Sequence, residues 1–511
     1  MTPSTIVHER RNLLAPINRL PLDVLFLIPT HLTSLRDRLR VTFVCRHWRR
    51  TFLQYAALWN KLYLTRRTDG LLTRTLIERA KGIPLDITVD YSMPPNQEDV
   101  ALLPPFAQQI RSLEIKNTNP DHIGLLTLYI SGPLPSLHTI QISTWRYQHD
   151  SYFWAAPTLG FFRGAMNLKN FHLYTGGYPS LQHFTFPNLT TLNFSTYAWR
   201  FPVSRLLDFL EASPALRQIR LQITTKVLCE DVPPERLIVL SHVKTFFLDV
   251  SFVAFGYETI ATHISCPFAN HVELTRVLTH SIILEDIYPP SIPWNIIARQ
   301  YTEGMVERVV VEMTMDEHHL VDCSINFRSS ERTTLKLSYT HHFKNKGHKA
   351  HAMNLKRWIP GVLSRALRTI QDHPLLANVR HLHIKGGNLV DDLEPATEGV
   401  GRLLGSMGPL GDLTLEGCDL RPYLDAFLDI PLFAELIQPA SFPPIKELAI
   451  IRPIQLFRDE EEYAAAIVEL ARSQDARGMP FERMRFCTGL PSPLMDELAV
   501  FVGTISDEDE C

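Results

Sequence analysis

Long apolar runs, closely spaced cysteines and an excess of one charge are all missing from this sequence. No stretch approaches the roughly 18 consecutive apolar residues that a membrane-spanning helix needs. The 511 residues carry 51 basic and 54 acidic side chains, a net charge of −3, so no overall field favours nucleic acid or an anionic membrane. We therefore expect neither nucleic acid nor a membrane among the partners. The seven cysteines are scattered, at Cys45, Cys229, Cys266, Cys323, Cys418, Cys487 and Cys511.

The first residues, MTPSTIVHERRNLL, lack the charged-then-apolar layout of a secretory signal. An odd, dispersed set of cysteines in such a chain favours reduced thiols and an intracellular address, cytoplasmic or nuclear. The acidic end, DEDEC, is typical of a solvated tail. Apolar residues make up 45% and charged residues 21% of the chain, which is the profile of a core-forming protein.

Sequence patterns that carry chemistry are also missing. Neither G-x-S-x-G nor H-E-x-x-H occurs, and the third glycine of GVGRLLG (399–405) stands one place late for a dinucleotide loop. His381 and His383 flank an apolar residue on an expected strand and would need a third ligand to hold a metal. The basic loop HHFKNKGHKAH (341–351) is read as a connector or as a grip for an acidic group. We expect no catalytic residues, no metal and no cofactor, and hence no enzyme.

The stretch LRVTFVCRHWRR (39–50) is where the N-terminal region becomes informative. Placed on one helix over 39–52, its apolar residues form a continuous stripe while the arginines lie on other faces. Cys45 then behaves as a small apolar side chain, because Cys45 and His47 alone supply too few ligands for zinc. The stripe consists of Val41, Val44, Cys45, Trp48 and Phe52.

Two further helical patterns flank this stretch. LPLDVLFLIPTHL has a proline beside the helix start, followed by Val24, Leu25, Ile28 and Leu32 at helical spacing, and AALWNKLYL contributes Leu58, Trp59 and Leu62. Three short helices within about 45 residues bury little surface, so such a unit leans on a partner.

From about residue 84 a repeated unit, Φ-x-x-Φ-x-Φ with Φ apolar, takes over. It recurs as IRSLEI (110), LHTIQI (137), LKNFHL (168), LTTLNF (189), LRQIRL (216), VKTFFL (243), ANHVEL (269), VERVVV (306), VRHLHI (379), LGDLTL (410), IKELAI (445) and FERMRF (481). Its fourth and sixth positions share one side of a strand, and the first closes over the same core. One strand plus one crossover, repeated about a dozen times, favours an irregular leucine-rich-repeat solenoid over a plain α/β domain.

The long interval after VERVVV interrupts the repeats. VDCSINFRSS and TTLKLSYTHH alternate like strands, so we expect a small antiparallel meander there. The predicted fold class is α/β: a three-helix N-terminal domain, then an irregular solenoid of parallel strands with this insert. The predicted segments are a tail (1–17), the helical domain (18–62), the solenoid (63–505) with the meander (about 306–340) and the basic His-rich loop (341–357), and the acidic tail (506–511).

The N-terminal pattern resembles an F-box, which opens with Leu-Pro and an acidic residue, continues with Val-Cys-Arg-x-Trp and closes with Leu-Trp. The residues that match are Leu20, Pro21, Leu25, Leu32, Val44, Cys45, Arg46, Trp48, Leu58 and Trp59. Chains with an F-box before degenerate leucine-rich repeats, of the kind abundant in mushroom-forming fungi, are similar in layout. Asp23 stands where glutamate is commoner, and Pro29 interrupts the first helix early.

The resemblance implies that the chain docks onto the Skp subunit of a Skp–cullin–F-box ubiquitin ligase, and through it onto a cullin, while the solenoid binds an unknown substrate protein. The alternative that it leaves open is a Skp-bound scaffold acting outside the ligase. The residues expected to contact Skp are Leu20, Pro21, Leu25, Ile28 and Leu32, as an apolar surface that the chain covers poorly.

Substrate contacts are expected on the solenoid's strands. The fifth position of each unit faces outward from the strand sheet, which predicts a ladder of Gln141, His172, Asn193, Arg220, Phe247 and Glu273. Its mixed charge suits a protein segment better than nucleic acid. Aromatic side chains just beyond the strand ends, the type enriched at recognition hot spots, are either anchors along the ladder or part of the crossover core: Trp145, Tyr174, Tyr197 and Trp199.

Overall fold

The structure is a computed structural model. It describes residues 15–32, 34–66, 68–93, 97–118, 126, 130, 133–144, 165–175, 186–196, 200–224, 226–228, 232–233, 235–251, 260–279, 308–315, 320–328, 334–342, 379–385, 410–416, 445–451, 460–476, 478–486 and 492–507. None of the helices among these residues is both long and apolar enough to cross a membrane. The chain divides into two compact units, residues 1–199 with 208–216 and residues 200–207 with 217–511.

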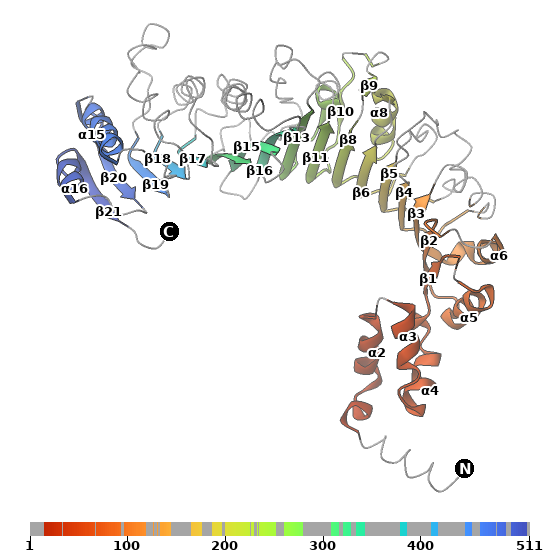
Figure 1. Ribbon diagram of the computed structural model, residues 1–511. Helices are drawn as coiled ribbons and strands as arrows, with labels where there is room; N and C mark the ends of the chain where they lie inside the picture. Colours follow the sequence, from red (N-terminus) through yellow and green to blue (C-terminus); the bar gives the residue numbers. More distant parts are fainter. Residues whose placement is uncertain are drawn as a thin grey trace, which may run out of the picture. The chain divides into compact units, whose positions relative to one another are not determined.

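Three short helices open the first unit and lie side by side (Figure 1). They are α2 (Leu22–Thr30), α3 (Leu35–Val41) and α4 (Arg46–Gln54), with the 3-10 turns η1 (Pro16–Arg19) before and η2 (Ala56–Leu58) after them. Ser34 caps α3 because its hydroxyl oxygen accepts a hydrogen bond from the Asp37 amide at 3.1 Å. The predicted three-helix domain is therefore present.

The predicted continuous helix over 39–52 is wrong. The chain leaves the helix after Val41 and re-enters it at Arg46, where the Cys45 sulfur accepts a hydrogen bond from the Trp48 amide at 3.5 Å as the N-cap of α4. Val44 consequently lies in the turn, 60% exposed, instead of in the buried stripe. Helical spacing alone could not reveal this, because a four-residue turn keeps the apolar residues on either side nearly in phase.

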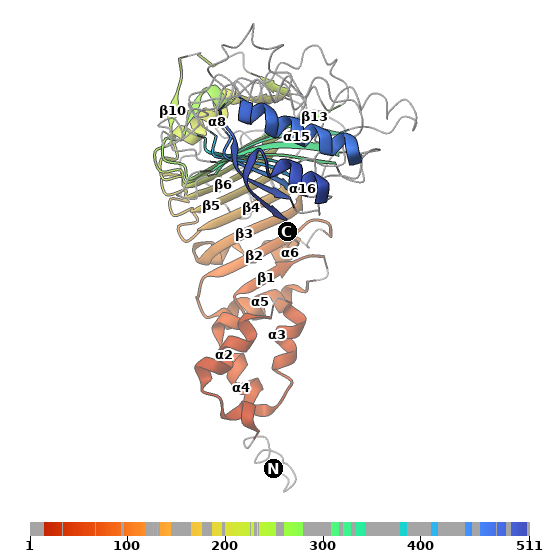
Figure 2. The same ribbon diagram turned by 90° about the vertical axis from the view of Figure 1, so that its left-hand side faces the viewer.

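The rest of the first unit is a parallel sheet with helical crossovers. Its strands are β1 (Lys61–Leu64), β2 (Leu85–Asp90), β3 (Ile110–Thr118), β4 (Thr139–Thr144), β5 (Asn170–Thr175) and β6 (Thr191–Thr196), paired in that order. The connections include α5 (Gly70–Ala80), α6 (Gln97–Val100) and η3 (Pro104–Gln109). Figure 2 shows these strands lying side by side in sequence order.

One face of this sheet is the core of the unit. Apolar residues occupy the same register on successive strands and are at most 1% exposed: Ile87, Leu113, Ile140, Phe171 and Leu192. The first residue of each repeat unit, such as Leu137 or Leu168, is also fully buried. The fourth, sixth and first positions therefore share one core, as the repeat pattern predicts.

The second unit is also built mainly of parallel strands. Its main sheet runs β8 (Gln218–Ile223), β11 (Thr245–Ser251), β13 (His271–Thr279), β16 (Thr334–His342), β15 (Leu320–Arg328), β14 (Arg308–Met315), β17 (His381–Lys385), β18 (Asp412–Glu416), β19 (Glu447–Ile451), β20 (Phe481–Phe486) and β21 (Val502–Asp507). Short parallel pairs join β7 (Arg200–Pro202) to β9 (Lys226–Leu228) and β10 (Ile238–Val239) to β12 (Ile264–Ser265). Its helices include α15 (Glu460–Ala476) and α16 (Ser492–Leu498), and α8 (Val203–Glu211) is shared between the units.

The predicted α/β fold class is confirmed, including the meander. Strands β14, β15 and β16 pair antiparallel in sequence order. The meander is not appended at a margin but lies within the sheet, because β16 pairs parallel with β13 and β14 pairs parallel with β17. It extends to His342, so the first residues of the predicted His-rich loop belong to β16 and the remainder of that loop lies outside the described residues.

Candidate partner-binding surfaces

The three-helix region is held together by aromatic side chains. Trp48 and Phe52 meet edge to face at 5.2 Å between ring centroids, and Phe52 is fully buried. The Trp48 indole donates a hydrogen bond to the Asn18 side-chain oxygen at 2.6 Å, which fixes η1 against the start of α4. The Trp59 indole donates to the Phe52 carbonyl at 3.0 Å. The chain before α2 and the turn before α4 therefore lie at the same end of this region.

Most of the predicted Skp-contact residues reach the surface, but Leu25 does not. Leu20 and Pro21 are exposed, and Ile28 and Leu32 are partly exposed. Leu25 is 0% exposed, so its prediction as a surface contact is wrong in this structure. The adjacent residue, Phe26, stacks on Tyr55 at 4.0 Å between ring centroids and approaches Phe52 of α4.

Apolar residues that the sequence reasoning did not assign to this surface are exposed instead. Leu27 is 59% and Phe43 68% exposed. The available signal was the composition of α2, LDVLFLI, which is apolar almost all round, more than one core-facing stripe requires. We call the following set the apolar end: Ile17, Leu20, Leu22, Val24, Leu27, Phe43 and Val44.

A buried arginine joins the helices to the sheet. The Arg38 guanidinium donates hydrogen bonds to the Leu58 carbonyl at 2.8 Å and the Lys61 carbonyl at 2.9 Å, and the residue is 4% exposed. Lys61 is the first residue of β1, whose described pairing is with β2 alone. Arg38 therefore satisfies a carbonyl at the edge of the sheet, where no further strand is described. The domain boundary predicted after residue 62 falls inside β1.

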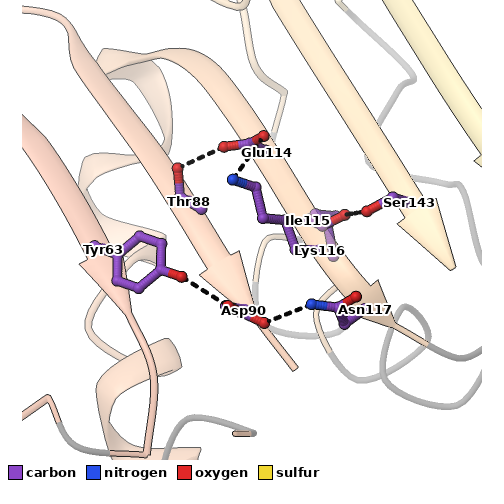
Figure 3. A network of polar contacts seen from close by, with 8 residues as sticks. All are labelled: Tyr63, Thr88, Asp90, Glu114, Ile115, Lys116, Asn117 and Ser143. Carbon is purple, nitrogen blue, oxygen red and sulfur yellow. Dashed lines mark hydrogen bonds and ion pairs between the residues drawn. The ribbon is translucent and has the colours of Figure 1, made fainter. Parts of the chain in front are cut away.

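The outer face of the first sheet carries a compensated polar network (Figure 3). The Asp90 carboxylate accepts hydrogen bonds from the Tyr63 hydroxyl at 2.6 Å, the Asn117 amide at 3.0 Å and Ser92. Burial favours the neutral acid, but these hydrogen bonds outweigh it and hold the pKa of Asp90 well below its usual range. The same contact, with burial and nearby negative charge, raises the pKa of Tyr63 to about 12.

Further along this face the predicted ladder is in register. Gln141 aligns with His172, and His172 with Asn193. All three side chains are partly buried, and burial lowers the pKa of His172. Tyr174 lies on the same face, where its hydroxyl accepts a hydrogen bond from the Asn193 amide at 2.7 Å. Neither an anchor role nor a core role can be assigned to Trp145, Tyr197 and Trp199, which lie outside the described residues.

The ladder residues of the second unit are also in register. Arg220 aligns with Phe247, and Phe247 with Glu273. The Arg220 guanidinium carbon lies 5.6 Å from the centroid of the Phe247 ring, within cation–π range. Each part of the predicted ladder is therefore in register within its own unit.

Histidines elsewhere in the second unit are engaged with carboxylates. His381 contacts Asp412, and His383 lies 3.0 Å from Glu416. Over the described ranges, no three or more His, Cys, Asp and Glu side chains are grouped as a metal would require. The acid–imidazole pairs are therefore contacts between neighbouring strands of the sheet.

Comparison with known proteins gives one family match. Residues 17–65 match the family model described as F-box-like, and these are the residues that form η1, α2, α3, α4, η2 and β1. No curated protein matches the chain. The chain therefore carries an F-box-like domain at residues 17–65, followed by an α/β region whose parallel strands are leucine-rich-repeat-like.

Proposed function

We propose that this protein is a substrate-recognition adaptor of a Skp–cullin–F-box ubiquitin ligase. In this role the apolar end of the F-box-like domain docks onto the Skp subunit, and the strand face of the α/β region binds the substrate protein. The chain itself contributes binding and no catalysis. The observation that carries the proposal is the apolar end, because it belongs to the region that matches the F-box-like family model.

The apolar end exposes more apolar side chains than a folded domain of this size needs to expose. Helix α2 already buries Leu25 in the core, yet Leu22 and Leu27 on the same helix are 54% and 59% exposed. Exposed large apolar side chains that recur within one short region suggest an interaction site, and a helix that is apolar all round is normally covered on all sides. A partner that covers the exposed apolar residues of α2 would explain why this helix is apolar almost all round.

Charge around the apolar end adds a second expectation. Exposed arginines, among them Arg19 on η1 and Arg50 on α4, outnumber the two acidic residues of the helices, Asp23 and Asp37. A complementary partner surface would place carboxylates around an apolar centre. Because rim charges act mainly on the association rate, we expect Skp binding to become slower as salt rises.

The geometry of the strand face supports it as the proposed substrate-binding surface. Side chains in register on successive parallel strands form a continuous row, such as Gln141, His172 and Asn193, and solenoids use such surfaces to bind extended partners. The ladder residues and Tyr174 remain the proposed contacts.

Titration calorimetry of the full chain with purified Skp subunit tests the docking role. We expect Leu22→Glu with Leu27→Glu to abolish detectable binding, because two carboxylates would be desolvated in the interface. Leu71→Glu is the matched control, since Leu71 on α5 is 70% exposed but lies outside the F-box-like match; it should bind like the natural chain. No affinity of the natural chain for Skp would refute the proposal.

Cullin co-purification separates the ligase adaptor from the scaffold. An adaptor brings a cullin along with Skp from cell extract. Skp without cullin, in repeated purifications of the full chain, would favour the Skp-bound scaffold outside the ligase.

A further inference from the structure

On the outer face of strands β8, β11 and β13, one arginine has no carboxylate partner among the described residues. Arg220 is exposed on β8, and within the described part of the chain its guanidinium makes no ion pair or hydrogen bond, only the contact with the Phe247 ring at 5.6 Å. The carboxylate of Asp249 on the adjacent strand accepts a hydrogen bond from the Gln222 amide at 3.1 Å. Arg220 therefore retains its hydrogen-bond donors for another group.

Two other arginines, on β3 and β20, are compensated by carboxylates within the chain. Arg111 on β3 donates to both oxygens of Asp86 at 3.0 and 2.6 Å, and Arg483 on β20 lies 3.0 Å from Glu447. Those charges stabilise the pairing of neighbouring strands. Arg220 instead lies against an aromatic ring.

The ring that holds Arg220 is itself fixed. Phe246 and Leu248, on either side of Phe247, are 0% and 1% exposed and anchor β11 in the core. On the side away from Arg220, the His271 ring lies 5.1 Å from Phe247, centroid to centroid. A guanidinium resting on a fixed ring loses less freedom on binding and keeps its planar fork of N–H donors, which matches a carboxylate.

We propose that Arg220, supported by Phe247, recognises a carboxylate side chain in an extended acidic segment of the substrate protein. The inference rests on the proposed adaptor function and names the substrate class of that same face. The strand neighbours of Arg220 on this face are amides, Gln218 and Gln222. Gln218, which is exposed, can bond the main chain of such a segment. Nucleic acid would require a run of basic residues here.

Selection from a displayed library of random peptides tests this proposal. The full chain in complex with the Skp subunit is immobilised, and peptides that bind the natural chain are compared with those that bind Arg220→Gln. We expect enrichment of Asp and Glu on the natural chain and its loss with Arg220→Gln. The best acidic peptide, synthesised and labelled, should bind Arg220→Gln about ten times more weakly, as expected for one charge-assisted contact.

Two further variants separate recognition from folding. Arg217→Gln removes another exposed arginine just before β8, and it should keep the full acidic preference. Phe247→Leu keeps an apolar side chain but removes the ring. It should weaken binding of the acidic peptide by a smaller factor than Arg220→Gln does. Thermal unfolding of each variant shows whether the sheet is intact.

Each other outcome overturns the carboxylate assignment. These are no enriched peptides, an acidic preference that survives Arg220→Gln, and Arg220-dependent binding seen only with serine-phosphorylated peptides. Skp affinity, measured by calorimetry on the same samples, reports on the adaptor role separately. If the chain binds Skp but shows no preference for acidic peptides, only this inference is refuted. If it selects acidic peptides but does not bind Skp, only the docking role is refuted.

Discussion

Replacement of Arg38 by methionine should loosen the junction between the helices and the sheet. Methionine keeps most of the apolar stem but removes both guanidinium hydrogen bonds, to the Leu58 carbonyl at 2.8 Å and the Lys61 carbonyl at 2.9 Å. The residue is 4% exposed, so water reaches these carbonyls poorly once the donor is gone.

The expected magnitude follows from two opposing effects. Hydrogen bonds from a charged donor contribute roughly 1.5–3 kcal/mol each. The guanidinium also carries a desolvation cost, visible in its lowered pKa and in an Nε with no partner, and methionine avoids that cost. We therefore expect the free energy of local opening around β1 to fall by about 2–4 kcal/mol.

Hydrogen–deuterium exchange of the full chain, followed in the peptide that covers residues 58–65, measures this change. A loss of about 2–4 kcal/mol corresponds to exchange faster by a factor of roughly thirty to several hundred. Arg40→Met is the control, because Arg40 is exposed and paired with Asp37 at 3.0 Å, a surface contact worth less than about 1 kcal/mol. Unchanged protection of β1 in Arg38→Met, or a loss spread evenly over the whole chain, would refute the reasoning.

Two further predictions concern titration and thiol reactivity. Tyr63→Phe removes one donor to Asp90, so the pKa of Asp90 should rise towards its ordinary value. Because a lowered carboxyl pKa stabilises the fold only above the unfolded value, near pH 4, and the raised pKa of Tyr63 stabilises it only below about pH 10, the stability lost in Tyr63→Phe should be constant between about pH 5 and 9. It should shrink as pH falls below 4, and thermal unfolding across this range showing a constant difference would contradict the assignment. Cys45 is partly exposed, whereas Cys266 is 0% exposed and burial raises the pKa of its thiol. Iodoacetamide should therefore modify Cys45 before Cys266 in the native chain, and equal labelling of both thiols, read by mass spectrometry, would show that Cys266 is accessible.

The repeated strands could be predicted because their signal is local. In LHTIQI and LKNFHL the alternation of apolar and polar residues is complete within six positions, and each places its strand at the expected site. The register of Gln141 with His172 then follows from equal positions in successive units. The outward direction of the ladder needed no knowledge of distant contacts.

The contacts that were missed depend on distant parts of the chain. Arg38 is buried because carbonyls about twenty positions further along meet it, and no local pattern distinguishes it from its solvated neighbours. Leu25 and Leu27 are equally apolar, and only the packing of α4 and Tyr55 against α2 decides which side is covered. The break before α4 depends on a cysteine acting as an N-cap, a role in which serine, threonine, aspartate and asparagine are the usual signals.

The placement of the meander constrains how the second sheet can assemble. In a regular solenoid each strand docks on the one made just before it, so folding can spread along the chain and an array can be shortened at any repeat. Here β13 pairs with β16, which follows two further strands in the sequence, and the parallel partner of β14 is β17. The span from β13 to β17 therefore closes as one cooperative block, because strands far apart in the sequence must pair with one another. Shortened chains that end before β13 lack this block and those that end after β17 keep it whole, whereas a chain that ends between β13 and β16 leaves the edge of β13 without its partner.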